Sequence, residues 1–211
     1  MNDHVLTSLI NLFALFSSST SLDEEKARAV VKDYLTAFFS IRNYEEYLDL
    51  YDTLCEVYAI NRPDQQQIIE QVAGKLTDRI TKADQALLVL RFMEFSAQNR
   101  EAYHKEQGLF ALVARTMNVD EQTFRDFDLF IEGRSGDNVA VVAMEHDTGT
   151  LRVLRMPAMN KVVVAYDGAT QLRMNNTPFQ PGTFITWPEN GVIKSAKTRP
   201  YYFSYVTALL V

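Results

Sequence analysis

The sequence contains a single cysteine among its 211 residues, so no disulfide can form within the chain. A chain with one thiol is expected in a reducing compartment, which favours a cytoplasmic location. Cys55 lies inside the apolar helical pattern LDLYDTLCEVYAI, where a small buried hydrophobic side chain is the expected role. A catalytic thiol is the disfavoured alternative, because it would need a basic, partly exposed setting that the neighbouring residues do not provide.

Basic residues and long apolar runs are also scarce. The chain has 21 basic against 27 acidic residues, which gives no electrostatic reason to bind nucleic acid. Its most apolar stretch near the start, LINLFALF at residues 9–16, is too short to cross a bilayer. The residues before it lack the positive charge of a signal peptide, so this stretch is expected to be a first helix in the cytosol.

The motifs that usually reveal an activity are missing. The sequence has no G-x-x-x-x-G-K-[ST], no G-x-G-x-x-G after a strand, no G-x-S-x-G, no H-E-x-x-H and no C-x-x-C. We therefore expect no catalytic residues and no cofactor in this chain, and we do not expect it to be an enzyme. A small enzyme is the least favoured alternative, because no residues point to it.

What the sequence does contain is helical periodicity over its first part. From residue 5 to residue 131, apolar residues recur at the i, i+3, i+4 spacing of helices with one buried face. The first stripe illustrates the spacing: Leu6, Leu9, Ile10, Phe13 and Phe16. The pattern predicts an all-α domain over residues 1–131, a bundle of about seven helices.

The remaining residues have the composition of strands. After the turn-like segment EGRSGDN at 132–138 come short runs rich in Val, Tyr, Phe and Thr, such as VAVVAME, KVVVAY and YYFSYV. Asp167-Gly168 and Asn190-Gly191 are strong predictors of two-residue hairpin turns. We expect an antiparallel sheet or sandwich of about six strands over residues 132–211, and hence an α+β protein.

Two clusters of aromatic residues are candidates for an interaction surface. Tyr44, Tyr47 and Tyr51 lie along one predicted helix, and Tyr201, Tyr202 and Tyr205 lie near the C-terminal end. Most such clusters belong to a core. Tyrosine also suits an interface, where the ring is buried while the hydroxyl stays hydrated.

Acidic residues offer a second, weaker candidate. Glu45, Asp49 and Asp52 share one face of a predicted helix. A solvated acidic face is the favoured interpretation, and a metal or acid–base site is the alternative.

The helical part resembles the TerB-like fold of tellurite resistance. The segments LFALFSSSTSLDEEKARAVVKDYL and LRFMEFSAQNREAYHKEQGLFALVARTM share the form apolar helix, polar loop, acidic residue, apolar helix. In that family, Asp-Gly pairs in the loops and a Glu opening the next helix are associated with divalent metal. Glu24 or Glu25 and Glu106 match the Glu, but the Asp-Gly pairs are absent here. The resemblance implies the fold and leaves metal binding unknown.

The β part is similar to the N-terminal regions of certain bacterial ABC-transporter ATP-binding proteins. The resemblance rests on LRMNNTPFQPGTFITWPENGVIKSAKTRPYYFSYV, with its Asn175-Asn176 turn, its Gly191-Val192-Ile193 step and its Pro200-Tyr201-Tyr202 strand. Asn176 stands where that pattern has glycine, and Phe203 is an insertion before Ser204. Forkhead-associated-like sheets occur in the same setting, but the Arg, Ser and His pattern of a phosphothreonine reader is absent.

Together the resemblances imply a non-catalytic regulatory or docking region of such a transporter protein, whose ATPase would lie beyond this chain. The expected partner is a protein or the remaining domains of the parent, and any membrane association would come through the parent. The apolar ending YYFSYVTALLV is consistent with a chain that continues past Val211. The alternative is a divalent-metal-binding TerB-like protein of the stress response.

Overall fold

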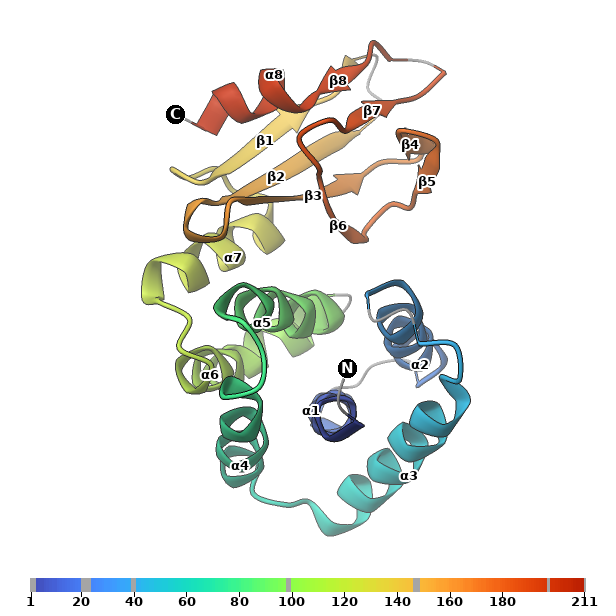
Figure 1. Cartoon of the computed structure of the whole chain (residues 1–211), viewed down its shortest axis with the longest axis vertical. Helices are drawn as coiled ribbons and strands as arrows, with labels where there is room; N and C mark the ends of the chain where they lie inside the picture. The colour runs from blue at the N-terminus through green and yellow to red at the C-terminus, as the bar shows by residue number, and fades with distance from the viewer. Residues whose placement is uncertain are drawn as a thin grey trace. The chain divides into compact units, whose positions relative to one another are not determined.

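The computed structural model describes residues 3–19, 24–38, 41–97, 100–145, 149–196 and 198–210. These residues form eight α-helices, most of them in the first part of the chain, and eight strands in the second (Figure 1). The expected α+β class is therefore confirmed. The chain divides into two compact units, Met1–Asp120 and Glu121–Val211, which are described separately.

The first unit is entirely helical among its described residues. Its helices are α1 (Asp3–Ser19), α2 (Glu24–Asp33), α3 (Glu45–Asn61), α4 (Gln65–Thr77), α5 (Lys82–Ala97) and α6 (Arg100–Thr116), with a π-helical segment at Tyr34–Phe38. The start of α4 illustrates how local chemistry sets a boundary. The Asp64 carboxylate accepts hydrogen bonds from the backbone N–H of Gln66 and Gln67, which would otherwise be unsatisfied.

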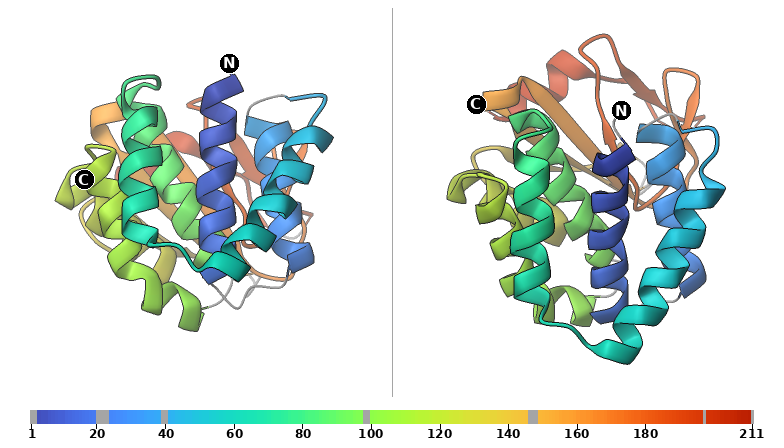
Figure 2. Two further views of the ribbon diagram at one scale, coloured as in Figure 1. Left: turned by 90° about the horizontal axis from the view of Figure 1, so that it is seen from below. Right: turned by 60° about the horizontal axis from the view of Figure 1, so that its bottom comes forward.

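Helix α1 lies in the middle of this unit. It contacts α2, α3, α4 and α5, with α4 on one side and α3 on the other (Figure 2). The predicted stripe on α1 is buried, but so are Val5, Leu12 and Leu15, because helices cover α1 on more than one face. Phe13 forms the centre of an aromatic cluster, with ring centroids 4.7 Å from Phe92 and 5.2 Å from Tyr34.

The second unit contains one helix followed by two antiparallel sheets. Helix α7 (Glu121–Glu132) precedes a first sheet in the order β1-β2-β3-β6 and a second sheet in the order β5-β4-β7-β8. The strands are β1 (Val139–Ala143), β2 (Thr150–Met156), β3 (Lys161–Asp167), β4 (Leu172–Met174), β5 (Thr177–Phe179), β6 (Phe184–Thr186), β7 (Val192–Lys194) and β8 (Tyr201–Tyr202). A short helix, α8 (Phe203–Thr207), and a 3-10 turn at Ala208–Leu210 follow them.

The first sheet is covered on both faces within this unit, which explains its nearly continuous apolar strands. One face, carrying Leu151, Val153 and Val164, packs with buried residues of the second sheet and of α8. Helix α7 contacts the other face, where the rings of Phe130 and Phe184 have centroids 4.9 Å apart. Strands covered in this way read as apolar runs rather than as alternating patterns.

Arg152 of β2 ties α7 to the sheet. Its guanidinium donates to the backbone carbonyls of Phe130 and Ile131, at 2.7 and 2.8 Å, in the last turn of the helix. The Phe130 carbonyl also accepts from the Gly133 N–H at 3.3 Å. It also forms an ion pair with Asp167 of β3, with an Nε–Oδ2 distance of 2.6 Å. Nη2 donates to Asp167 Oδ1 at 3.0 Å, whereas Nε lies close to Oδ2 without hydrogen-bond geometry. The Arg152 residue is only 7% exposed, so the Asp167 carboxylate compensates a charge that water barely reaches.

The sequence placed the end of the helical domain at residue 131, whereas the compact units of the structure divide after Asp120. Helix α7 is counted with the sheets because its buried residues face them. Its Asp126 carboxylate, for example, accepts from Asn138 Nδ2 at 2.8 Å just before β1. Gly133, with φ of 68°, ends the helix in the left-handed conformation that glycine adopts most easily.

Three local expectations in the β part were wrong. Asp167-Gly168 and Asn190-Gly191 do not close hairpins, because the strands on either side of each pair belong to different sheets. Neither glycine has the positive φ that such a turn requires. The two-residue hairpin is instead Asn175-Asn176, between β4 and β5, with Asn175 at φ 54°.

The run YYFSYV is a strand only at Tyr201–Tyr202 and continues as helix α8. Helical spacing brings Val206 and Leu210, four residues apart, into the core on one side of the segment.

We predict that Arg152→Met destabilises the protein by about 2–4 kcal/mol, because it removes the guanidinium that donates to the last carbonyls of α7 and pairs with the Asp167 carboxylate. Chemical denaturation followed by circular dichroism measures the free energy of unfolding. Arg134→Met is the matched control: Arg134 pairs with Glu132 at 2.8 Å, but its side chain is 58% exposed. Its loss should lower stability by less than about 1 kcal/mol. Equal effects of the two substitutions would contradict the role assigned to Arg152.

We also predict that Phe13→Ala destabilises the helical unit by about 3–5 kcal/mol, because it opens a cavity within the aromatic cluster. Thermal unfolding of the full chain measures it. Ile60→Ala on α3 provides the comparison, since Ile60 is 81% exposed and its truncation should change stability by less than about 0.5 kcal/mol.

Candidate functional site

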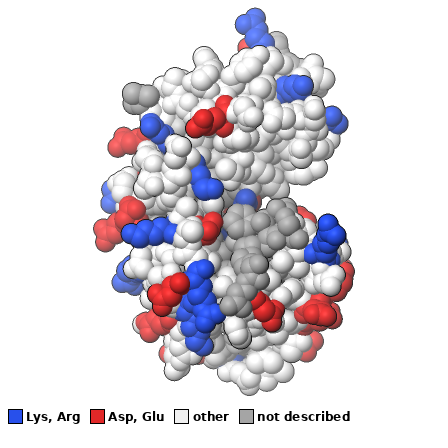
Figure 3. Space-filling view, viewed as in Figure 1, with Lys and Arg blue, Asp and Glu red and all other residues white. Residues whose placement is uncertain are grey.

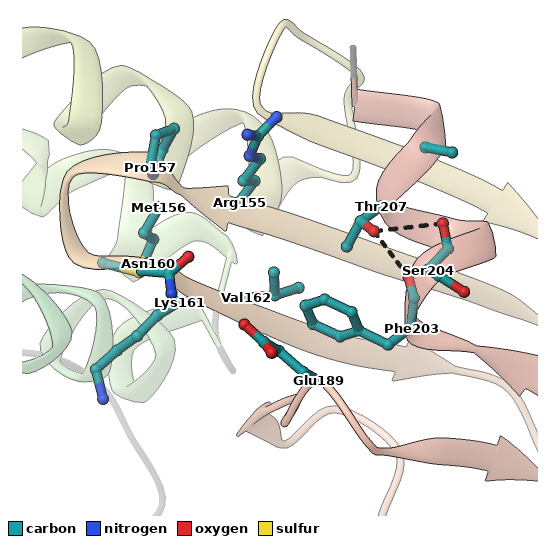
Figure 4. A pocket seen from close by; sticks show the side chains of 11 residues that line it. Arg155, Met156, Pro157, Asn160, Lys161, Val162, Glu189, Phe203, Ser204 and Thr207 are labelled. Atoms are coloured by element: carbon teal, nitrogen blue, oxygen red, sulfur yellow. Dashed lines mark hydrogen bonds between the residues drawn. The ribbon is translucent and has the colours of Figure 1, made fainter.

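A cavity of about 460 Å³ opens in the β unit between the β2–β3 connection and the C-terminal segment. It is lined by Arg155, Met156, Pro157, Asn160, Lys161, Val162, Glu189, Phe203, Ser204, Thr207 and Ala208. Figure 4 shows Val162 and the Phe203 ring in the middle of the cavity, with polar side chains around them. An apolar floor with a polar rim is the usual form of a pocket that receives an anchoring side chain.

The polar rim is set by the connection between β2 and β3. A 3-10 turn at Pro157–Met159 ends at Asn160, whose φ of 48° reverses the chain. Arg155 and Lys161 therefore lie close to the same end of the sheet. The Arg155 guanidinium donates to the carbonyl of Leu210 at 3.3 Å, which joins this end of the sheet to the C-terminal segment.

The C-terminal segment forms the opposite wall of the cavity. It is held by Val206 and Leu210 in the core and by an edge-to-face contact between Phe203 and Trp187, whose centroids are 5.9 Å apart. Three other apolar side chains of this segment remain in solvent. Tyr202, Tyr205 and Leu209 are 54%, 65% and 52% exposed, although Val206 between Tyr205 and Leu209 is buried.

The six tyrosines singled out in the sequence lie in different environments. Tyr201 is 8% exposed, and its hydroxyl accepts a hydrogen bond from the Glu145 backbone N–H. Tyr51 is 3% exposed, with its hydroxyl 2.5 Å from Ser17 Oγ. The structure thus places Tyr51 and Tyr201 in cores, and it leaves Tyr202 and Tyr205 as the members available to a partner.

The other two, Tyr44 and Tyr47, are partly exposed. The ring of Tyr44 lies beneath Lys32 Nζ at 4.9 Å, and the Tyr47 hydroxyl donates to Asp3 Oδ1 at 2.6 Å. They belong to the helical unit, whereas the C-terminal tyrosines belong to the β unit.

The acidic face of α3 is paired with a cation from α2. Asp52 forms an ion pair with Arg28 of α2 at 3.0 Å. The pKa of Arg28 is raised above its ordinary value, chiefly by the hydrogen bond to Asp52, with contributions from the charges of Glu45 and Asp49. Throughout the part of the chain that the structure describes, no three His, Cys, Asp or Glu side chains are grouped to hold a metal ion.

The glutamates matched to the TerB-like pattern are not equivalent. Glu24 and Glu25 are exposed at the start of α2, whereas Glu106 on α6 is 5% exposed. The divalent-metal hypothesis gains no support from these positions and stays a prediction.

Sequence reasoning missed the cavity residues. The segment MPAMNK between two apolar runs contained a usable signal, since a tight turn there places Arg155 and Lys161 at one end of a hairpin. The opposite wall could not be found, because YYFSYV was expected to be a strand and its helical half forms that wall.

Comparison of the chain with protein-family models, curated protein sequences and solved structures finds no match. The resemblances to TerB-like and forkhead-associated-like domains and to transporter proteins therefore remain predictions. None of the helices in the described ranges is long and apolar enough to cross a membrane. On the face shown in Figure 3, basic and acidic side chains are interspersed rather than gathered by sign.

Cys55 provides a test of the packing around α3. Its thiol lies 4.0 Å from the Ala14 carbonyl, and burial raises the pKa of Cys55 to about 11. At about pH 8 an unperturbed thiol is roughly a quarter ionised. We predict that Cys55 reacts with iodoacetamide about 100-fold more slowly in the native protein than in urea, since only the thiolate attacks. Comparable rates in the two states would contradict the burial of this thiol.

Proposed function

We propose that the chain is a non-catalytic docking module that binds a protein partner through the C-terminal segment of its β unit. The observation that carries the proposal is the exposure of Tyr202, Tyr205 and Leu209, each more than half accessible, on a segment that Val206 and Leu210 anchor in the core. Tyrosines on a rigid support contribute large contact areas at a low entropic cost, and they are enriched among the residues that dominate binding.

The adjacent cavity supports the same function. Val162 and Phe203 form an apolar floor on which a side chain of the partner can be buried. Among the charged residues of the rim, Arg155 and Lys161 oppose a single carboxylate, Glu189. We therefore expect the partner to insert an apolar or aromatic side chain that is flanked by an acidic residue, which would pair with one of these cations.

We further propose that this module serves an ABC-transporter ATP-binding protein, on the basis of the resemblance of residues 172–206. In this setting the partner is another part of the transporter, and the ATPase is a further domain of the parent protein. The module is then cytoplasmic, at the inner face of the membrane. The natural reading frame should then encode G-x-x-x-x-G-K-[ST] in the same protein. A stop codon directly after Val211 would contradict this assignment without affecting the docking proposal.

We predict that a photoreactive amino acid at Tyr205 in the full chain crosslinks to one protein partner in cells of the natural host. Once the partner is purified, Tyr205→Ser combined with Leu209→Ser should weaken its binding at least about tenfold, because two exposed anchors are lost. Calorimetry measures the affinity, and a thermal melt verifies that the variant remains folded.

Ile60→Ser is the control, because Ile60 is the most exposed large apolar residue described and lies on α3 of the other unit. Its affinity for the partner should equal that of the unmodified protein. Crosslinks only between copies of this chain, absence of any adduct, or unchanged affinity of the double variant would each overturn the proposal.

A further inference from the structure

A second cavity, in the helical unit, has a different chemical character from the docking site. It is a groove of about 380 Å³ between α1 and α4. His4, Thr7, Ser8 and Asn11 line it from α1, and Val72 and Lys75 line it from α4, together with Arg79 just beyond the end of that helix. No acidic side chain is among its lining residues as described, although the protein as a whole carries a formal charge of −6.

The two cations of the groove are available to a ligand. Lys75 lies in the last turn of α4 and Arg79 in the turn that follows the helix, and both line the groove. Both are exposed, and neither forms an ion pair within the described ranges. In a chain with more acidic than basic residues, two unpaired cations on one wall of a groove form a local attraction for anions.

A hydrogen bond fixes the orientation of the Asn11 side chain on the opposite wall. The Asn11 carbonyl oxygen, Oδ1, accepts a hydrogen bond from the Tyr58 hydroxyl at 2.5 Å. This fixes the amide and leaves its two Nδ2 hydrogens as donors. A phenol is protonated at neutral pH and burial raises the pKa of Tyr58 further, so the hydroxyl continues to donate to the amide oxygen.

The hydroxyls of the groove do not compete as donors. Thr7 Oγ1 donates to the Asp3 carbonyl at 3.0 Å, and Ser8 Oγ donates to the His4 carbonyl at 2.9 Å. The nearest carboxylate in sequence, Asp3, is engaged by the Tyr47 hydroxyl. Besides His4, which also lines the groove, the polar groups that face a ligand are an amide N–H pair, an ammonium and a guanidinium.

From this arrangement we propose that the groove between α1 and α4 binds the phosphate group of a small phosphorylated molecule, with Lys75, Arg79 and Asn11 as its ligands. A guanidinium donates two parallel hydrogen bonds to phosphate oxygens, and the ammonium adds a point charge. The groove is larger than one phosphate, so the phosphate is one end of the molecule, and Val72 provides an apolar contact for the rest. This site belongs to the helical unit, whereas the proposed docking surface belongs to the β unit.

The test uses the full chain and inorganic pyrophosphate at low ionic strength. Calorimetry should show binding that weakens as salt is added, because the contacts are exposed. Pyrophosphate should also shift the side-chain amide resonances of Asn11 in a nitrogen–proton correlation spectrum. Lys75→Gln combined with Arg79→Gln should weaken binding at least about tenfold, and Asn11→Asp, which adds a carboxylate of the same shape, should abolish it.

Lys105→Gln combined with Arg125→Gln is the matched control, since it removes the same charge from exposed positions outside the groove. It should leave the affinity within about twofold of the original. Undetectable pyrophosphate binding, an equal loss in the control, or no shift of the Asn11 amide would overturn the proposal. Binding to phosphatidylglycerol vesicles in preference to pyrophosphate would also contradict it, because it would point to a lipid headgroup.

Discussion

The β unit depends on the burial of Arg152 at the point where α7 meets the first sheet. One guanidinium caps the helix carbonyls of Phe130 and Ile131 and pairs with Asp167 across β2 and β3. Its plane also lies near the rings of Phe130 and Phe184, at 5.4 and 5.7 Å from their centroids. A buried charge is costly without its counter-charge and acceptors, so the helix and both strands must hold their positions together.

Because α7 and Arg152 occupy one face of the first sheet, the candidate site is built on the opposite face. With α7 against one face, the second sheet and α8 cover the other, and the C-terminal segment is anchored there by Val206 and Leu210. Tyr202, Tyr205 and Leu209 are then displayed on a support that is fixed by the core. A docking surface of this kind loses little entropy on binding, because its backbone is already ordered.

The sequence was sufficient to predict the fold class but not the position of particular residues. Helical periodicity identified α1 to α7, and β-branched runs such as KVVVAY identified the long strands. Turn preferences failed at Asp167-Gly168 and Asn190-Gly191, because tertiary packing sends the following strands to a second sheet. Helix α8 was missed since aromatic residues favour strands locally, and its cavity wall was missed with it. The pairing of Arg152 with the end of α7 joins residues about twenty positions apart and leaves no local pattern.

Helix α7 and the β2–β3 pair form one cooperative unit held by Arg152. Native-state hydrogen exchange of the full chain tests it most directly. The account predicts that amides of α7, β2 and β3 open with the same free energy, and that Arg152→Met lowers this value equally for all three while α1 is unchanged. The account would be contradicted if the amides of α7 opened with the same free energy as those of α6 instead. Rapid exchange of α7 while β2 and β3 stay protected would also contradict it.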